Sequence, residues 1–120
     1  MLLEVSPLSW YVYMLRCAPD TLYTGSTPDP AHRLRQHLGL ISGGAKYTRA
    51  HPPRALAALW SVPDARAAHS LEWHIKRFTR AQKLRLIAAP DTLSALLGDP
   101  AMDARALDLS DYDSFFNDLS

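Results

Sequence analysis

The chain has 120 residues, of which 48% are hydrophobic, which favours one folded domain over a disordered chain. No apolar run approaches the roughly 20 residues of a membrane-spanning helix. Cys17 is the only cysteine, which excludes an internal disulfide and a Cys-based zinc site, and without a signal-peptide pattern the expected location is the cytoplasm. The net charge of +1 divides into +7 over residues 1–89, which favours an anionic partner such as nucleic acid, and −6 over residues 90–120.

The first predicted element is a β-hairpin. Residues 10–17 are rich in Tyr, Val and Leu, which is typical of a strand, and residues 21–26 are predicted to pair with them across a Pro-Asp turn. Because side chains alternate between the two faces of a sheet, we expect Tyr13 and Tyr23 to lie roughly opposite each other on one face.

A helix is predicted to follow the hairpin. Asp29 is a good N-cap, Pro30 suits the first helical position, and Gly39 is a typical stop. Arg33 and His37 are four residues apart and therefore share one face of this helix. This arrangement would bring a guanidinium and an imidazole close to the two phenols.

The segment 39–53 is rich in Gly and Pro and is predicted to be a flexible loop. Within it, Lys46, Tyr47 and Arg49 place an aromatic ring between two cations. This pattern suits contact with single-stranded nucleic acid, although ordinary solubilising charge gives the same pattern.

The middle of the chain is predicted to add one strand and three helices. Residues 55–62 form a short apolar run, which favours a buried strand. Asp64 is placed to cap a long helix, a capping box from Thr79 to Gln82 begins a second, and residues 91–97 form a third, shorter one. Four cations on the first two helices are expected to follow a phosphate backbone: Lys76, Arg77, Arg80 and Lys83.

Glu72 is the only carboxylate between Asp64 and Asp91, and it borders the buried face of its predicted helix. A single hard oxygen ligand suits one Mg²⁺ or Mn²⁺ ion held mainly by waters and by a substrate phosphate. Together with a cation, two tyrosines and a histidine, this inventory matches phosphodiester hydrolysis. A tyrosine would act as the base if nearby cations lowered its pKa from about 10.

These motifs also resemble the GIY-YIG nuclease domain, and in particular its small stand-alone bacterial branch, the YhbQ type. The resemblance extends over about residues 9–88. One departure is that Tyr11 stands where the first motif has its glycine, whereas the second motif keeps its glycine. The positions that carry the resemblance are Tyr11-Val12-Tyr13, Tyr23-Thr24-Gly25, Arg33, His37 and Glu72.

The resemblance implies an α/β (α+β) domain with a small three-stranded antiparallel sheet flanked by helices, and an acidic C-terminal extension over residues 89–120. It implies a metal-dependent endonuclease that cuts DNA one strand at a time in DNA repair or processing, with one Mg²⁺ or Mn²⁺ per site. Gly25 is structural in this pattern. By this resemblance, Tyr13 would be the general base and Tyr23 would order the water or the phosphate. Arg33 would bind the phosphate, and His37 would assist the proton transfer. Glu72 would be the metal ligand.

Three alternatives remain open at this point: a nucleic-acid-binding module with weak or lost catalysis, a nuclease subunit that needs a partner protein, and an RNA-directed nuclease. The acidic extension is also open to more than one interpretation. Its apolar residues Leu107, Leu109, Phe115 and Phe116 are expected to dock on the body or on a partner, where the tail's charge would compete with nucleic acid, or simply to complete the core.

Overall fold

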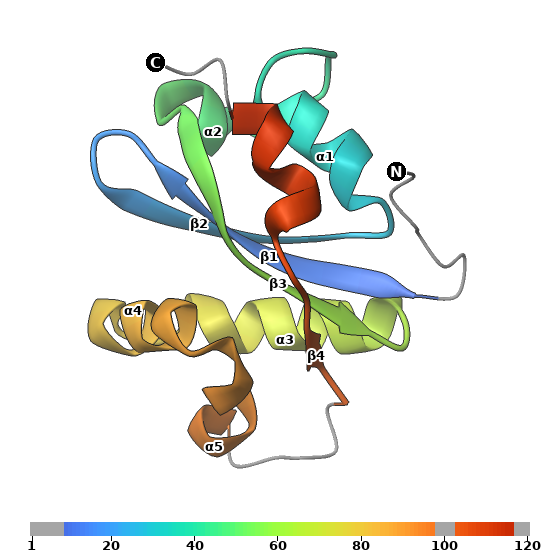
Figure 1. Cartoon of the computed structure of the whole chain (residues 1–120), viewed down its shortest axis with the longest axis vertical. Coiled ribbons are helices and arrows are strands. Elements are labelled where there is room, and N and C mark those ends of the chain that lie inside the picture. The colour runs from blue at the N-terminus through green and yellow to red at the C-terminus, as the bar shows by residue number, and fades with distance from the viewer. Residues whose placement is uncertain (1–8, 98–102, 117–120) are drawn as a thin grey trace.

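The computed structural model describes residues 9–97 and 103–116, which form one antiparallel sheet with helices on both faces (Figure 1). The strand order is β2–β1–β3–β4, so the three strands that the sequence predicts are confirmed and a short fourth strand extends the sheet. The strands are β1 (Trp10–Cys17), β2 (Thr21–Thr27), β3 (Pro53–Val62) and β4 (Arg105–Ala106). The helices are α1 (Pro30–His37), α2 (Lys46–Ala50), α3 (Ala65–Lys76), α4 (Arg80–Ala88) and α5 (Leu93–Leu97), with 3₁₀ segments η1 (Pro90–Thr92) and η3 (Ser110–Phe116).

The helix boundaries follow the predicted capping residues. The Asp29 side chain accepts a hydrogen bond from the backbone N–H of His32 at the start of α1, and Gly39, with φ of +78°, follows its end. Asp64 caps α3 in the same way, and Thr79 forms a complete capping box at the start of α4. None of the helices within residues 9–97 and 103–116 is long and apolar enough to span a membrane.

The prediction of a loop throughout residues 39–53 is wrong, because this segment contains helix α2. The backbone N–H of Arg49 donates to the carbonyl of Ala45, closing one helical turn. Thr48 is buried, and the Tyr47 ring stacks on Tyr23 of the sheet. Packing against the sheet therefore outweighs the breaking tendency of the neighbouring glycines.

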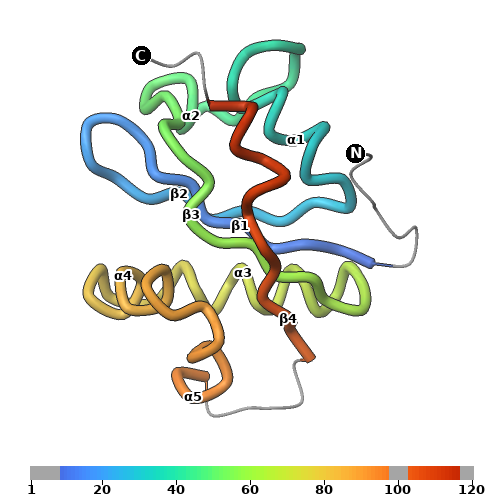
Figure 2. The backbone as a smooth tube through the Cα atoms, viewed as in Figure 1, coloured from blue at the N-terminus to red at the C-terminus, as the bar shows by residue number. Residues whose placement is uncertain are grey.

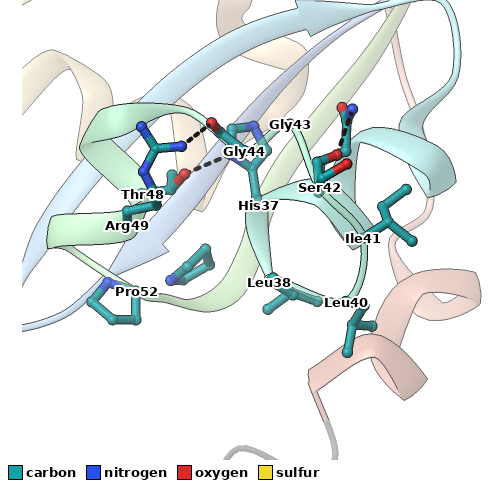
Figure 3. Close-up of a pocket in the computed structure, with 13 residues that line it drawn as sticks. His37, Leu38, Leu40, Ile41, Ser42, Gly43, Gly44, Thr48, Arg49 and Pro52 are labelled. Carbon is teal, nitrogen blue, oxygen red and sulfur yellow. Dashed lines mark hydrogen bonds between the residues drawn. The ribbon is translucent and has the colours of Figure 1, made fainter.

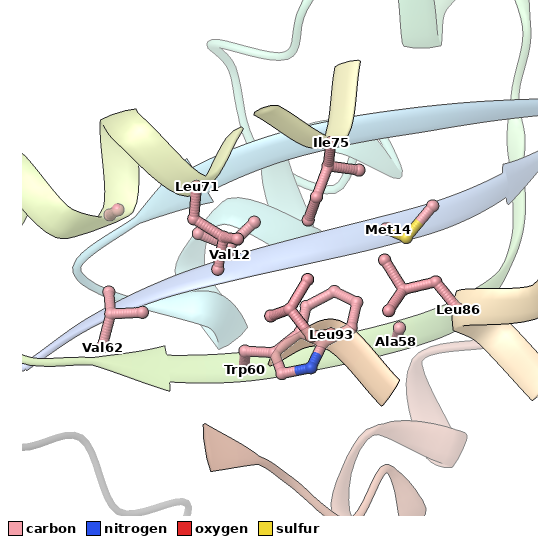
Figure 4. Close-up of a cluster of buried hydrophobic side chains, with 10 residues drawn as sticks. Val12, Met14, Ala58, Trp60, Val62, Leu71, Ile75, Leu86 and Leu93 are labelled. Atoms are coloured by element: carbon pink, nitrogen blue, oxygen red, sulfur yellow. The ribbon is translucent and has the colours of Figure 1, made fainter. Parts of the chain in front are cut away.

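The two faces of the sheet are covered by different helices, as the backbone trace shows (Figure 2). On one face, Val12, Met14 and Trp60 pack against α3, α4 and α5 in a cluster of hydrophobic side chains (Figure 4). On the other face, Tyr11 and Tyr13 pack with α1, α2 and η3. The tyrosines that the sequence singles out thus lie on the face opposite α3.

The C-terminal segment completes the second face. Ala106 pairs with Trp60 of β3, and the backbone N–H of Leu107 donates to the carbonyl of Leu59 at 2.9 Å. Tyr112 is buried beside Tyr11, so in the described residues the apolar part of the tail docks on the body of its own chain. The partly buried side chains that join it are Leu107, Leu109, Phe115 and Phe116. Asp99 and Asp118 of the predicted acidic tail lie outside the described residues.

Candidate functional site

The β1–β2 hairpin brings the two tyrosines together diagonally. Its register pairs Tyr13 with Gly25 and Leu15 with Tyr23, so the tyrosines lie on one face but are offset by two residues along the strands. Their ring centroids are 6.3 Å apart and the rings are tilted by 39°. The expected placement on one face is therefore present, with the offset set by the register.

Gly25 is the residue over which the Tyr13 ring lies. A Cβ atom at position 25 would collide with the hydroxyl oxygen and ring carbon of Tyr13. The glycine therefore leaves the space in which Tyr13 can lie flat against the neighbouring strand. This is a packing requirement, since the backbone of Gly25 lies in a regular strand.

His37, the last residue of α1, links Tyr13 to α2. Its Nε2 atom lies 2.6 Å from the Tyr13 hydroxyl. Its Nδ1 atom lies 2.8 Å from the hydroxyl of Thr48 (Figure 3). The Thr48 hydroxyl donates its one proton to the carbonyl of Ala45, at 3.1 Å, so it accepts from His37 Nδ1–H. This assignment leaves Nε2 unprotonated and able to accept the proton of the Tyr13 hydroxyl.

Burial keeps both ends of this hydrogen bond uncharged. Burial, and to a smaller extent the nearby charge of Arg33, lowers the pKa of His37 to about 4. Burial also raises the pKa of Tyr13, and the Tyr23 hydroxyl adds to that rise, while Arg33 opposes it. The condition that the sequence sets for a tyrosine base, a pKa lowered by nearby cations, is therefore not met, because desolvation outweighs the lowering by Arg33.

The buried imidazole predicts a specific pH dependence of stability. The folded-state pKa of His37 is about 4, below the ordinary value of 6.5, so the unfolded chain takes up this proton first as the pH falls. The free energy of unfolding should therefore decrease between about pH 6.5 and pH 4, by about 3 kcal/mol from this group. Urea unfolding at pH 7 and pH 4.5 measures it.

Matched histidine variants isolate this contribution from the other titrating groups. His37→Gln should lose most of the difference between the two pH values, whereas His32→Gln, at an exposed position on the same helix, should keep it. Equal pH dependence in the wild-type protein and His37→Gln would contradict the assignment of a neutral, buried His37.

Arg33 lies beside the Tyr13–His37 pair, half-buried on α1. Its Nη1 atom donates to the Gln36 side-chain oxygen and to the carbonyl of Gly43, both at 2.8 Å. These bonds hold the guanidinium in one orientation, and its charge acts on both Tyr13 and His37. The sequence placed Arg33 and His37 on a common helix face, and the structure brings that face to the tyrosines.

Glu72 reaches the edge of the same site from α3. Its carboxylate accepts a hydrogen bond from the Ser26 hydroxyl at 2.5 Å and forms an ion pair with Lys76 at 2.6 Å. The Glu72 side chain is 21% exposed, and the Lys76 ammonium also lies 6.0 Å from the centre of the Tyr23 ring. The carboxylate is thus oriented, partly open to water and already paired with a cation.

This geometry fits a divalent ion held by one carboxylate. Among residues 9–97 and 103–116, no group of three or more His, Cys, Asp or Glu side chains is placed to hold a metal. Glu72 supplies one hard oxygen ligand, which suits Mg²⁺ or Mn²⁺ completed by water and phosphate oxygens. Such an ion and the Lys76 ammonium would compete for the same carboxylate.

The predicted nucleic-acid contacts lie on α2, at the end of α3 and on α4. Tyr47 is stacked on Tyr23 and on His51, with centroids 5.5 and 4.3 Å apart, so its ring is part of the site. Tyr47, Arg80 and Lys83 line one open groove of about 240 Å³. Arg80 forms an ion pair with Asp20 at 3.1 Å.

The remaining predicted contacts are spread over exposed positions. Lys46 and Arg49 lie on α2, where Arg49 donates to the carbonyl of Gly44 beside a larger groove of about 660 Å³ (Figure 3). Lys76 and Arg77 lie at the end of α3. The structure therefore gathers two of the predicted cations, Arg80 and Lys83, at the smaller groove and places Arg49 at the larger one. The others lie at exposed positions outside both.

Sequence reasoning missed two side chains that position the others, Thr48 and Ser26. Thr48 lies inside the segment that was singled out for its Lys-Tyr-Thr-Arg pattern, but only its burial beneath His37 reveals its role. Ser26 directly follows Gly25 and faces α3. The alternation of side chains along the strand was the signal that could have identified it.

The chain is similar to several known proteins. Residues 9–85 match the model of the "GIY-YIG catalytic domain". The chain is 41% identical over 88 residues to the UPF0213 protein YhbQ of Salmonella typhimurium, covering 73% of this chain and 86% of the relative. It is 38% identical over 90 residues to a UPF0213 protein of Xanthomonas campestris, covering 75% and 86%. The solution NMR structure of a UPF0213 protein from Bacillus halodurans is 33% identical and covers 76% of this chain and 98% of its own, with a TM-score of 0.44.

Proposed function

Because the chain belongs to the family of GIY-YIG catalytic domains, we propose that it is a metal-dependent endonuclease that hydrolyses DNA phosphodiesters one strand at a time. One observation carries this proposal: the Tyr13 hydroxyl donates to a neutral, buried His37 whose tautomer is held by Thr48, within reach of the charge of Arg33. A phenol coupled to an unprotonated imidazole is equipped to accept a proton from water.

The proton path follows from the hydrogen bonds. Tyr13 accepts a proton from the attacking water as its own proton passes to Nε2 of His37. The phenol therefore need not exist as a phenolate beforehand, which agrees with a pKa raised by burial. Thr48 holds the Nδ1–H of the imidazole and so keeps Nε2 available as the acceptor.

Charge at the phosphate is handled by Arg33 and Glu72. Arg33 presents a fixed guanidinium to the developing negative charge. Glu72 would hold a Mg²⁺ or Mn²⁺ ion, which when bound supplies Lewis-acid stabilisation of the phosphate and of the leaving oxygen. The Tyr23 ring neighbours both the Tyr13 ring and the Lys76 ammonium, and it orders the substrate phosphate or the water.

The cations around the site favour a nucleic-acid substrate. Arg80 and Lys83 line the groove beside Tyr47, and Lys46, Arg49 and Lys76 are exposed near it. We assign DNA as the substrate and DNA repair or processing in the cytoplasm as the role. RNA cleavage, or binding without cleavage, are outcomes that the following assay distinguishes.

Cleavage assays with Mn²⁺ test the proposal directly. Labelled single-stranded, duplex and branched DNA and a matched RNA are incubated with the wild-type protein and Arg33→Ala. We expect wild-type cleavage of DNA and a loss of about a hundredfold or more in Arg33→Ala, as for removal of one charge-stabilising donor.

Arg35→Ala is the matched control, because Arg35 lies on the same helix with its guanidinium over the Phe115 ring. It should cleave at the wild-type rate. Absence of wild-type cleavage on every substrate, or equal rates for Arg33→Ala and wild type, would overturn the mechanism. Cleavage of the RNA alone would move the substrate class to RNA.

A further inference from the structure

Trp73 is an exposed indole beside the candidate metal ligand. It directly follows Glu72 on α3, and 54% of its surface is accessible. Successive residues of a helix are turned by about 100°, so Trp73 lies on the flank next to the one that carries Glu72 and Lys76. The indole therefore stands on an exposed flank of the helix that brings Glu72 to the edge of the site.

The Trp73 ring is held by a cation from the next helical turn. The Arg77 guanidinium lies 4.4 Å from the centre of the indole, and both side chains are exposed. Arg77 makes no ion pair within the described part of the chain, so the donors at its edge are available to a phosphate. A guanidinium thus lies over the ring of an exposed indole at the surface.

The charge around this pair fits a polyanion. Lys76, Arg80 and Lys83 follow on α3 and α4, while Glu72 is the only acidic residue in either helix. The other large exposed apolar side chains, Leu40 and Ile41, lie in the loop after α1. Among the exposed apolar residues of the described chain, Trp73 is the one that combines an aromatic face with neighbouring cations.

From these observations we infer that Trp73 and Arg77 form a stacking site for an unpaired DNA base, with Arg77 and Lys76 contacting the adjoining phosphates. Aromatic rings next to cations bind single strands because every base has a flat face to stack. A base in a duplex has both faces covered by its neighbours, so this site selects substrates with unpaired nucleotides. The inference rests on the proposed function and narrows its substrate class.

Binding without divalent ions tests the site independently of cleavage. Fluorescence anisotropy in EDTA compares a labelled single strand with a blunt duplex of the same sequence. Trp73→Ala should weaken single-strand binding by about tenfold to a hundredfold, and Trp73→Phe by much less, because Phe keeps a stacking face. Arg77→Gln should lower the salt slope of single-strand binding by about 0.7.

Leu40→Ala removes a comparable exposed apolar side chain and should bind both DNAs like the wild type. The inference is overturned if Trp73→Ala binds the single strand as well as the wild type does, or if it loses single-strand and duplex affinity equally. Failure of the proposed function has a different signature, since the wild type would then cut none of the DNA substrates with Mn²⁺ whatever the binding of Trp73→Ala.

Discussion

Replacement of Tyr13 by Phe is expected to slow DNA cleavage by about a hundredfold to ten-thousandfold, the usual contribution of a positioned acid or base. The substitution removes the hydroxyl that donates to His37 and keeps the ring that packs on Gly25. The unfolding free energy should fall by only about 1–3 kcal/mol, because buried Nε2 of His37 loses its partner. Single-turnover cleavage with Mn²⁺ and urea unfolding give the two quantities.

Tyr11→Phe is the matched control for this substitution. Tyr11 is buried on the same strand and the same sheet face, and its neighbours include Tyr112 of the C-terminal segment. It should retain wild-type cleavage. A Tyr13→Phe protein that cuts at the wild-type rate would place the base at another residue, and an equal loss in Tyr11→Phe would show that the effect is structural.

Gly25→Ala is expected to abolish detectable cleavage although it adds a single methyl group. The new Cβ atom would occupy the space of the Tyr13 hydroxyl and ring, so the ring must turn away from His37. Overpacking a buried position of this kind costs about 1–3 kcal/mol of stability. The expected phenotype is therefore a folded, moderately destabilised protein whose proton relay is broken.

A double-substitution experiment separates this explanation from a general intolerance of the strand. In a Tyr13→Leu background the ring is absent, so adding Gly25→Ala should lower the unfolding free energy by clearly less than it does in the wild type. Thermal or urea unfolding of the four proteins measures the difference. Equal destabilisation in both backgrounds would mean that Gly25 is required for a reason other than Tyr13.

Local sequence patterns predicted the parts of the fold that short-range physics determines. The hairpin, the caps at Asp29 and Asp64 and the capping box at Thr79 depend on neighbouring residues, and all are present. The diagonal placement of Tyr13 and Tyr23 also depends on the strand register, which the turn motif alone did not determine.

The charge states within the site could not be predicted from residue types. Proximity of Arg33 suggested a lowered pKa for Tyr13, but the helices α1 and α2 exclude water from the phenol, and desolvation has the opposite sign and the larger size. The ion pair of Glu72 with Lys76 follows from their spacing of four residues, whereas the bond from Ser26 depends on how α3 crosses β2. Such contacts are determined by tertiary packing.

Because the C-terminal segment forms part of the second face of the sheet, the two faces are completed at different times as the chain is synthesised. The face formed by Val12 and Met14 has all the side chains of its buried cluster once Leu93 has been synthesised. The face that carries Tyr13 still lacks Tyr112 at that stage, because translation proceeds from the N-terminus. A growing chain therefore holds all of the first cluster before Tyr112 is added beside Tyr11, whereas the helices that cover Tyr13, α1 and α2, are made before either cluster is complete.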